Sequence, residues 1–318
     1  MRFLAVFFGG LAMVYAQDYP PAAGLPGATA IAANSSSFVA WATGVSVTRG
    51  HVNSSNPDFT AGGSSFASAG QPEFAIGFPD GNTVSLGDGG TAVLTFASPI
   101  VDGDGFDFAV FENGSATYLE LAFVEVSSDG EHFFRFPSHS QTQTDTQLGT
   151  FASPLPQYLN NLAGKYEGSF GTPFDLSELP DDPLLDKQHI THVKLIDVVG
   201  SIDPAYAGFD SFGNAVNDSF PTPFTSGGFD LQAVGVIHQQ ALGIDDFSGQ
   251  YFRVYPNPAT HFICIESIEQ FTASIFDSSG KLLIVSVDKQ IDISTLSAGV
   301  YLIRIDSNHQ QIIRFLKN

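Results

Sequence analysis

Short runs of β-branched and aromatic residues, separated by Gly, Pro, Asn and Asp, recur along most of the chain. Each run is long enough for one β-strand and too short for a helix, and no amphipathic helix of useful length is visible. Between residues 30 and 240 the strand-like runs are 92–96, 106–111, 119–126, 132–136, 192–198 and 229–236. The pattern predicts an all-β domain, best described as a jelly-roll-like β-sandwich.

The details of these runs predict how single strands are oriented. In the run 119–126, Glu120 and Glu125 interrupt an otherwise apolar sequence, which is typical of a half-buried strand with some irregularity. Asp129-Gly130 lies between two such runs and predicts a hairpin turn. The segment 138–186 is rich in Gln, Thr, Pro and Gly and predicts extended loops, which often carry function at such lengths.

The last part of the chain shows the same pattern of short apolar runs separated by turn-forming residues, in a shorter segment. Its apolar runs are 262–265, 273–276, 282–285, 300–305 and 312–315, with turn-forming residues between them. About six or seven strands in so short a stretch predict an Ig-like β-sandwich. The segment 244–250 has the Gly, Ser and acidic residues of a linker, so a domain boundary is expected there.

Several motifs within residues 251–318 resemble a known family. They are VYPNPAT at 254–260, IFDSSGK at 275–281, IDISTLSAGVYLIRI at 291–305 and RFLKN at 314–318. Together they are similar to the type A C-terminal sorting domain that is carried by cargo of the type IX secretion system of Bacteroidetes. The resemblance implies that this domain contacts the type IX machinery and directs the chain from the periplasm across the outer membrane. Such cargo is then released or attached to the cell surface.

The first residues of the chain are consistent with that route. Residues 1–16 hold one Arg, about a dozen apolar residues, and Val14 and Ala16 at positions -3 and -1 of a cleavage site. This pattern predicts a secretory signal peptide, and the alternative of a transmembrane anchor is disfavoured because the apolar run is shorter than the roughly 20 residues that span a bilayer. Residues 17–243 then form the predicted ligand-binding domain, and no transmembrane segment is expected in the mature chain.

The net charge narrows the possible partners. The chain has 33 acidic and 12 basic residues, a net charge of -21 and a pI near 4.3, and residues 17–243 alone hold 25 acidic and 5 basic residues. This negative charge repels the phosphate backbone of nucleic acids, so nucleic acid is excluded as a natural partner. It attracts cations, which are therefore the favoured partners. Cys264 is the only cysteine in the sequence, so no intramolecular disulfide is possible.

The N-terminal domain carries a second resemblance. The blocks 84–90, 107–113, 121–130 and 227–234 are similar to a diverse group of bacterial cell-surface β-sandwich modules. Some members of that group accompany outer-membrane uptake receptors, including those for corrinoids. The resemblance implies a surface location and an accessory role in uptake as one option, and it assigns no binding residue.

Two polar clusters are candidate metal sites. Asp102, Asp104 and Asp107 are separated by glycines, so their carboxylates can converge on a hard cation such as calcium. The alternative is a solvated acidic turn. The second cluster comprises Asp210, Asn214 and Asp218, whose side chains also commonly close turns by bonding to their own backbone.

The second cluster is also placed to form the rim of a ligand groove. The aromatic residues around it, which suit sugar rings or a planar ligand but can equally belong to the core, are Tyr206, Phe209, Phe212, Phe220 and Phe224. The ligand-binding residues predicted here are Tyr206, Phe209, Phe212 and Phe224.

Signatures of common enzymes are not found in the sequence. There is no H-E-x-x-H, G-x-S-x-G or P-loop motif, although 25 acidic residues in the N-terminal domain leave room for a carboxylate pair of a glycoside hydrolase. The sequence therefore predicts a non-catalytic secreted or cell-surface protein that captures an extracellular glycan or nutrient, with calcium as a candidate cofactor. The alternatives are an extracellular hydrolase, an accessory protein of an uptake receptor, and a structural adhesin.

Overall fold

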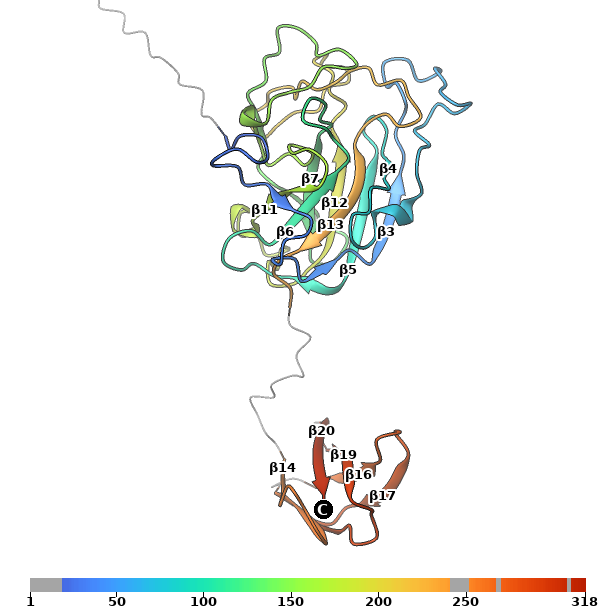
Figure 1. The fold of residues 1–318 in the computed structure, drawn as a ribbon, viewed down its shortest axis with the longest axis vertical. Coiled ribbons are helices and arrows are strands. Elements are labelled where there is room, and N and C mark those ends of the chain that lie inside the picture. The colour runs from blue at the N-terminus through green and yellow to red at the C-terminus, as the bar shows by residue number, and fades with distance from the viewer. Residues whose placement is uncertain (1–18, 241–251, 267–269, 308–309) are drawn as a thin grey trace, which may run out of the picture. The chain divides into compact units, whose positions relative to one another are not determined.

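The computed structural model describes residues 19–240, 252–266, 270–307 and 310–318, and it divides into two compact units, Met1–Leu242 and Gly243–Asn318 (Figure 1). The predicted signal peptide 1–16 and the predicted linker 244–250 lie outside the described residues. Among the described residues, no helix is long and apolar enough to cross a membrane.

The first unit contains two large antiparallel sheets. In the first sheet the strand order is β1 (Ile31–Ala32), β11 (Phe170–Phe174), β6 (Phe108–Glu112), β13 (Asp230–Val236) and β2 (Ala40–Trp41), with β4 (Val84–Ser85) also paired to β13. In the second sheet the order is β3 (Gly44–Thr48), β5 (Thr91–Ile100), β12 (Ile190–Asp197), β7 (Ala122–Ser127) and β8 (Phe134–Arg135). A small pair, β9 (His139–Ser140) with β10 (Leu159–Asn160), and three 3-10 turns, Pro72–Ala75, Pro156–Tyr158 and Leu176–Glu178, complete the unit.

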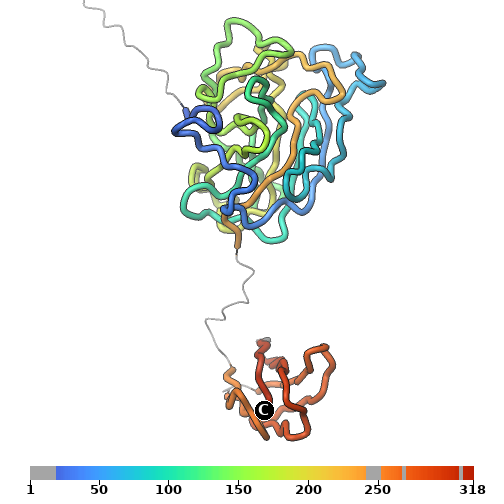
Figure 2. Tube along the Cα trace, viewed as in Figure 1, coloured from blue at the N-terminus to red at the C-terminus, as the bar shows by residue number. Residues whose placement is uncertain are grey.

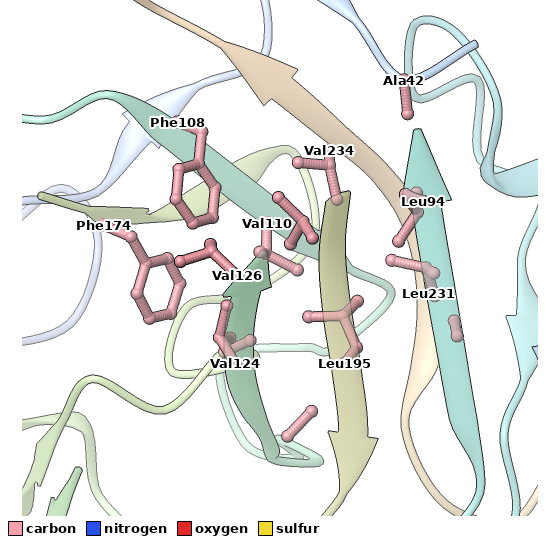
Figure 3. Packing of buried hydrophobic residues seen from close by; sticks show 14 of the residues in the cluster. Ala42, Leu94, Phe108, Val110, Val124, Val126, Phe174, Leu195, Leu231 and Val234 are labelled. Atoms are coloured by element: carbon pink, nitrogen blue, oxygen red, sulfur yellow. The ribbon is translucent and has the colours of Figure 1, made fainter. Parts of the chain in front are cut away.

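The core fills the space between the two sheets. In β6 the alternation of a strand points Phe108 and Val110 into this core, where they meet Leu195 of β12 and Val124 of β7 (Figure 3). The rings of Phe108 and Phe174 stack with centroids 5.3 Å apart. The all-β prediction is confirmed, and the two facing sheets form a β-sandwich; the jelly-roll-like connectivity stays a prediction.

The outer face of β7 is covered rather than exposed. The run 119–126 is predicted to be half-buried, but every residue of β7 is buried, because a second apolar cluster lies against its other face. Phe123 packs there against Leu159 of β10 and against Leu162 and Val216 from the loops. The prediction is therefore wrong for this strand, since loop residues distant in sequence cover the face that it expected to meet water.

The segment 138–186 contains more regular structure than extended loops. It includes β11, which pairs with both β1 and β6 and so extends the first sheet. The segment is coloured green to yellow-green in the chain trace (Figure 2). Gly171 and Pro173 within β11 are residues that argue against a strand when only the sequence is considered. The predicted loop assignment is corrected for Phe170–Phe174.

The outer face of the first sheet carries a small aromatic layer. Ala109 and Phe111 of β6, together with Ala233 of β13, pack there against Phe38 and Trp41. The aromatic rings lie close to the strand backbone because glycines stand beneath them. A Cβ atom at Gly171 would lie 2.8 Å from the Phe111 ring, and one at Gly235 would lie 2.7 Å from the Phe38 ring.

The second unit is a small β-sandwich with its own core. One sheet has the order β14 (Arg253–Tyr255), β15 (Phe262–Glu266) and β18 (Gln290–Asp292), and the other has the order β17 (Leu282–Ser286), β16 (Thr272–Phe276), β19 (Gly299–Asp306) and β20 (Gln310–Lys317). Ile263 of β15, Ile275 of β16 and Ile303 of β19 are fully buried in one cluster. The short apolar runs of the sequence thus correspond to real strands.

Candidate functional site

A large groove lies beside the aromatic layer of the first sheet. Its volume is about 850 Å³, within the size range of small-ligand sites. We call it the amide groove, and the lining residues used below are Asn34, Phe78, Asp80, Asn113, Phe170 and Gln232.

Phe78 presents an aromatic surface to the amide groove. Its side chain is 55% exposed, and its ring lies 5.3 Å from the Trp41 ring at a steep angle. Trp41 in turn packs against Phe38 and Phe111, with ring centroids 5.0 Å and 5.5 Å apart. Because the base of this stack is buried, Phe78 is held in place while part of its ring is free for a ligand.

Polar side chains face the same groove. Gln232 is 5% exposed, and its Nε2 donates a hydrogen bond to Oδ1 of Asn113 at 3.2 Å. Asn34 is exposed and also lines the groove. Hydrogen bonds from the backbone and side chain of Asn82 lower the pKa of Asp80, so its carboxylate is ionised at neutral pH. Amides, one carboxylate and an apolar ring together suit a ligand with both hydroxyl groups and C–H faces.

A second, smaller cavity shares Asn113 with the amide groove. Its volume is about 350 Å³. We call it the acidic cavity, and its side chains are Glu112, Tyr118, Glu120, Phe151, Phe224, Ser226 and Asp230. Glu112 is the last residue of β6 and Asp230 the first of β13, and the two strands are paired, so the sheet itself brings these carboxylates to one end.

The carboxyl groups of the acidic cavity are strongly perturbed. Burial, together with the charge of neighbouring carboxylates, raises the pKa of Glu112 and of Glu120 well above the ordinary value. Burial also raises the pKa of Asp230 to about 6, although Arg49 opposes the change. Among the ion pairs of the described residues, none includes any of these three carboxylates. The acidic cavity therefore gathers carboxyl groups that burial keeps from ionising and that no side-chain cation pairs with in the described residues.

The first predicted metal cluster is brought together only in part. Oxygens of Asp102 and Asp107 lie within 4.8 Å of each other and of Asp175, whereas Asp104 is exposed outside this group. Asp175 follows β11, and the pairing of Phe174 with Phe108 places it beside the Asp107 loop. Sequence reasoning missed Asp175 because it is distant in the chain, and no local signal marks it.

Asp107 has a structural role at this cluster. It is fully buried, its Oδ2 accepts a hydrogen bond from the Leu176 amide at 2.7 Å, and its Oδ1 accepts one from the Gly103 amide at 2.8 Å. Nδ1 of His238 lies 2.8 Å from the same Oδ1. Burial raises the pKa of Asp107. Its Oδ2 keeps one lone pair for a further ligand. Asp102, Asp107 and Asp175 can therefore each offer one carboxylate oxygen, which is the kind of ligand that calcium prefers.

Calcium is therefore expected to stabilise the protein through Asp102, Asp107 and Asp175. Calcium at about 100 times its Kd should raise the melting temperature by about 5 to 10 °C relative to chelator at matched ionic strength. Asp102→Asn should abolish the rise, and Asp104→Asn, two residues away but outside the group, should keep it. Equal melting temperatures in calcium and in chelator would contradict calcium binding and support the alternative of a solvated acidic turn.

In the second predicted cluster, the polar groups bond to the backbone. Asp210 accepts hydrogen bonds from the amides of Ser140, Phe212 and Asn214. Asn214 contacts Asp210 through its side chain, at 3.1 Å from Nδ2 to Oδ2. Asp218 accepts amide bonds elsewhere, from Leu121 and Ser219. This arrangement agrees with the turn-forming alternative for the three residues.

The four aromatic residues predicted to bind ligand are exposed but are not gathered in one groove. Phe212 is 70% exposed and packs against the His139 ring, with centroids 4.3 Å apart. Phe224 stacks on Phe151 and is the one member of the four that lines the acidic cavity. Tyr206 and Phe209 are 37% and 45% exposed and line neither the amide groove nor the acidic cavity.

None of the residues that line the amide groove was predicted from the sequence to bind a ligand. They come from segments far apart in the chain, and apart from the N-x-Ser pattern at Asn34 and Asn113 none of them stands in a motif with a characteristic spacing. The nearest signal is the Glu112-Asn113 pair, whose second residue lines both cavities.

Comparisons with known proteins identify the C-terminal unit. Residues 253–316 match the family described as the secretion system C-terminal sorting domain. No curated protein matches the chain.

The solved structures found include PorZ, a surface component of the type IX secretion system of Porphyromonas gingivalis, at 21% identity and TM-score 0.20, over 27% of this chain and 14% of that one. They also include β-glucuronidases of Faecalibacterium prausnitzii and Ruminococcus gnavus, each at 10% identity and TM-score 0.18, over 88% and 87% of this chain. The chain spans 45% and 44% of those enzymes. At such TM-scores these likenesses carry no argument about function.

Proposed function

Because the chain is type IX secretion cargo with a C-terminal sorting domain, exported to the cell surface or secreted, we propose that its N-terminal domain is a non-catalytic binding protein for an extracellular glycan. The sorting domain accounts for delivery and for the contact with the secretion machinery. The N-terminal domain is then the part that acts outside the cell.

The amide groove is the observation that carries this proposal. A sugar ring has an apolar face of C–H groups and a rim of hydroxyl groups, so it is bound by an aromatic side chain together with amides and carboxylates. Phe78 provides the ring, Gln232 and Asn113 provide an oriented pair of amides, and Asp80 provides an ionised acceptor. The rigid aromatic layer beneath Phe78 reduces the entropy lost on binding.

The chemistry of the groove supports binding rather than hydrolysis. Glycoside hydrolysis generally uses two carboxyl groups on opposite sides of the scissile bond. Asp80 is the one carboxylate among the described residues that line the amide groove. Calcium at Asp102, Asp107 and Asp175 would stabilise the domain without contacting a glycan in this groove, since none of these residues lines it.

Phe78→Ala should weaken glycan binding about tenfold, which is the loss expected for one aromatic contact. The full chain is first screened against neutral and acidic polysaccharides, and binding of the best one is then measured by isothermal titration calorimetry. Phe212→Ala is the matched control, because Phe212 is more exposed than Phe78 and lies outside the groove. Binding that is lost in Phe212→Ala and kept in Phe78→Ala would contradict the groove, and turnover of a polysaccharide would favour the hydrolase.

A further inference from the structure

The acidic cavity buries three carboxyl groups that form no ion pair within the described residues. Glu112 is 2% exposed and Glu120 is 8% exposed. Arg49 is close enough to Asp230 to lower its pKa. The Arg49 guanidinium, however, donates its hydrogen bonds to the backbone carbonyls of Ala69, Gly70 and Ser85. An unpaired charge is costly to bury, so these carboxyl groups hold a proton until a cation enters and stabilises their ionised form.

Glu120 is the least satisfied of these carboxylates. Its Oε1 lies 3.4 Å from the Tyr118 hydroxyl, which is longer than an ordinary O–H···O hydrogen bond. Its Oε2 accepts no hydrogen bond from any residue that the structure describes. By contrast, Glu112 accepts a 2.6 Å bond from the Gly114 amide, and Asp230 accepts one from the Ser85 hydroxyl. Glu120 is thus a carboxylate more than nine-tenths buried that faces the cavity with a free oxygen.

The spacing of the carboxylates argues against a single metal ion. Within the described ranges, the one group of three acidic or metal-binding side chains whose ligand atoms all lie within 4.8 Å is Asp102, Asp107 and Asp175. Glu112, Glu120 and Asp230 do not form such a group, although they line one cavity. A small ion cannot touch all three at calcium distances, whereas a larger cation with several N–H donors can.

Aromatic rings form another part of the wall. Phe151 is 79% exposed and stacks on Phe224, with ring centroids 5.9 Å apart and planes 29° from parallel. Tyr118 lines the cavity as well. Aromatic faces attract ammonium groups through the negative charge above the ring, and they also pack against alkyl chains. Carboxylates and aromatic faces in one cavity of about 350 Å³ form a suitable environment for an alkylammonium group.

We propose that the acidic cavity is a binding site for a primary alkylammonium group, held by Glu120 and Glu112 and covered by Phe151 and Phe224. The ammonium donates to the free oxygen of Glu120, and its carbon chain packs on the stacked rings. The raised pKa values of both glutamates support this site, because binding of a cation should drive off a proton that the buried carboxyl groups hold.

The test uses pentylammonium as the probe and 1-pentanol as its uncharged analogue. Binding to the full chain is measured by calorimetry in chelator at fixed ionic strength, in two buffers of different ionisation enthalpy. We expect saturable binding of pentylammonium, no binding of 1-pentanol, and proton release on binding. Glu120→Gln should weaken binding at least tenfold and Phe151→Ala severalfold, whereas Asp104→Asn, which removes an exposed charge elsewhere, should have no effect.

Three results would overturn the proposal. They are the absence of pentylammonium binding, an equal loss in Asp104→Asn and Glu120→Gln, and a calcium response that is lost in Glu120→Gln, which would make the cavity a metal site. Thermal unfolding of each variant excludes misfolding as the cause of a loss. Phe78→Ala should bind pentylammonium normally, so a failure of the amide groove and a failure of the acidic cavity can be told apart.

Discussion

A chain that ends at Gly243 is expected to remain in the periplasm instead of reaching the cell surface or the medium. The sorting domain at residues 253–316 belongs to a separate compact unit with its own core, so its removal leaves the N-terminal unit intact and deletes only the export signal. Immunoblots of periplasmic, surface and medium fractions should show export reduced to background. The full chain carrying Phe78→Ala should be exported normally.

The fold of the sorting domain should matter as much as its presence. Ile303 is fully buried at the centre of that unit, between β16 and β20 in the sheet. Ile303→Asp places a charge in this core and should abolish export like the truncation. Surface delivery of the chain that ends at Gly243 would show that the N-terminal unit carries its own signal, contrary to this expectation.

Stability is expected to fall as the pH rises from about 4 to about 8. Burial raises the pKa of Asp218 to about 7, although its carboxylate accepts hydrogen bonds from the amides of Leu121 and Ser219. In the unfolded chain an aspartate titrates near pH 4. Between these values the folded state holds a proton that the unfolded state has released, so the free energy of unfolding decreases as pH rises, by about 4 kcal/mol for this group.

Chemical denaturation at several pH values, with chelator present, measures this dependence. Glu112, Glu120 and Asp197 act in the same direction, because burial raises the pKa of each. Asp218→Asn removes one titrating group and should flatten the curve, although it lowers stability at every pH because an amide NH₂ replaces an acceptor. Asp104→Asn should leave the slope unchanged. A stability that instead increases toward pH 8 would show that these carboxylates are ionised and compensated in the folded protein.

Much of the fold could be predicted from local pattern. The alternation of a strand over the run 106–111 puts successive residues on opposite faces, and in the structure Phe108 and Val110 face the core while Phe111 faces outward. The hairpin at Asp129-Gly130 is confirmed by the pairing of β7 with β8. β11 could not be predicted in this way, because Gly171 and Pro173 are residues that strands usually avoid. Its position also depends on pairing with β6, which lies far away in the sequence.

The sites were much less accessible to sequence reasoning. The close spacing of Asp102, Asp104 and Asp107 predicts one metal site, yet the structure groups Asp102 and Asp107 with Asp175, which is distant in the sequence. The exposed Phe212 was a plausible ligand platform, but the groove with amides lies at Phe78.

Strand periodicity, charge and family motifs are properties of short or summed stretches of chain, so the strand-rich character, the acidic field of the N-terminal part and the sorting domain can be inferred from the sequence. Which carboxyl groups are buried together, and which aromatic side chain faces a groove, depends instead on how distant segments pack. A site of this kind depends on which strand ends meet at one edge of a sheet, and Glu112 and Asp230 are brought together by the pairing of β6 with β13, across more than a hundred residues of intervening chain.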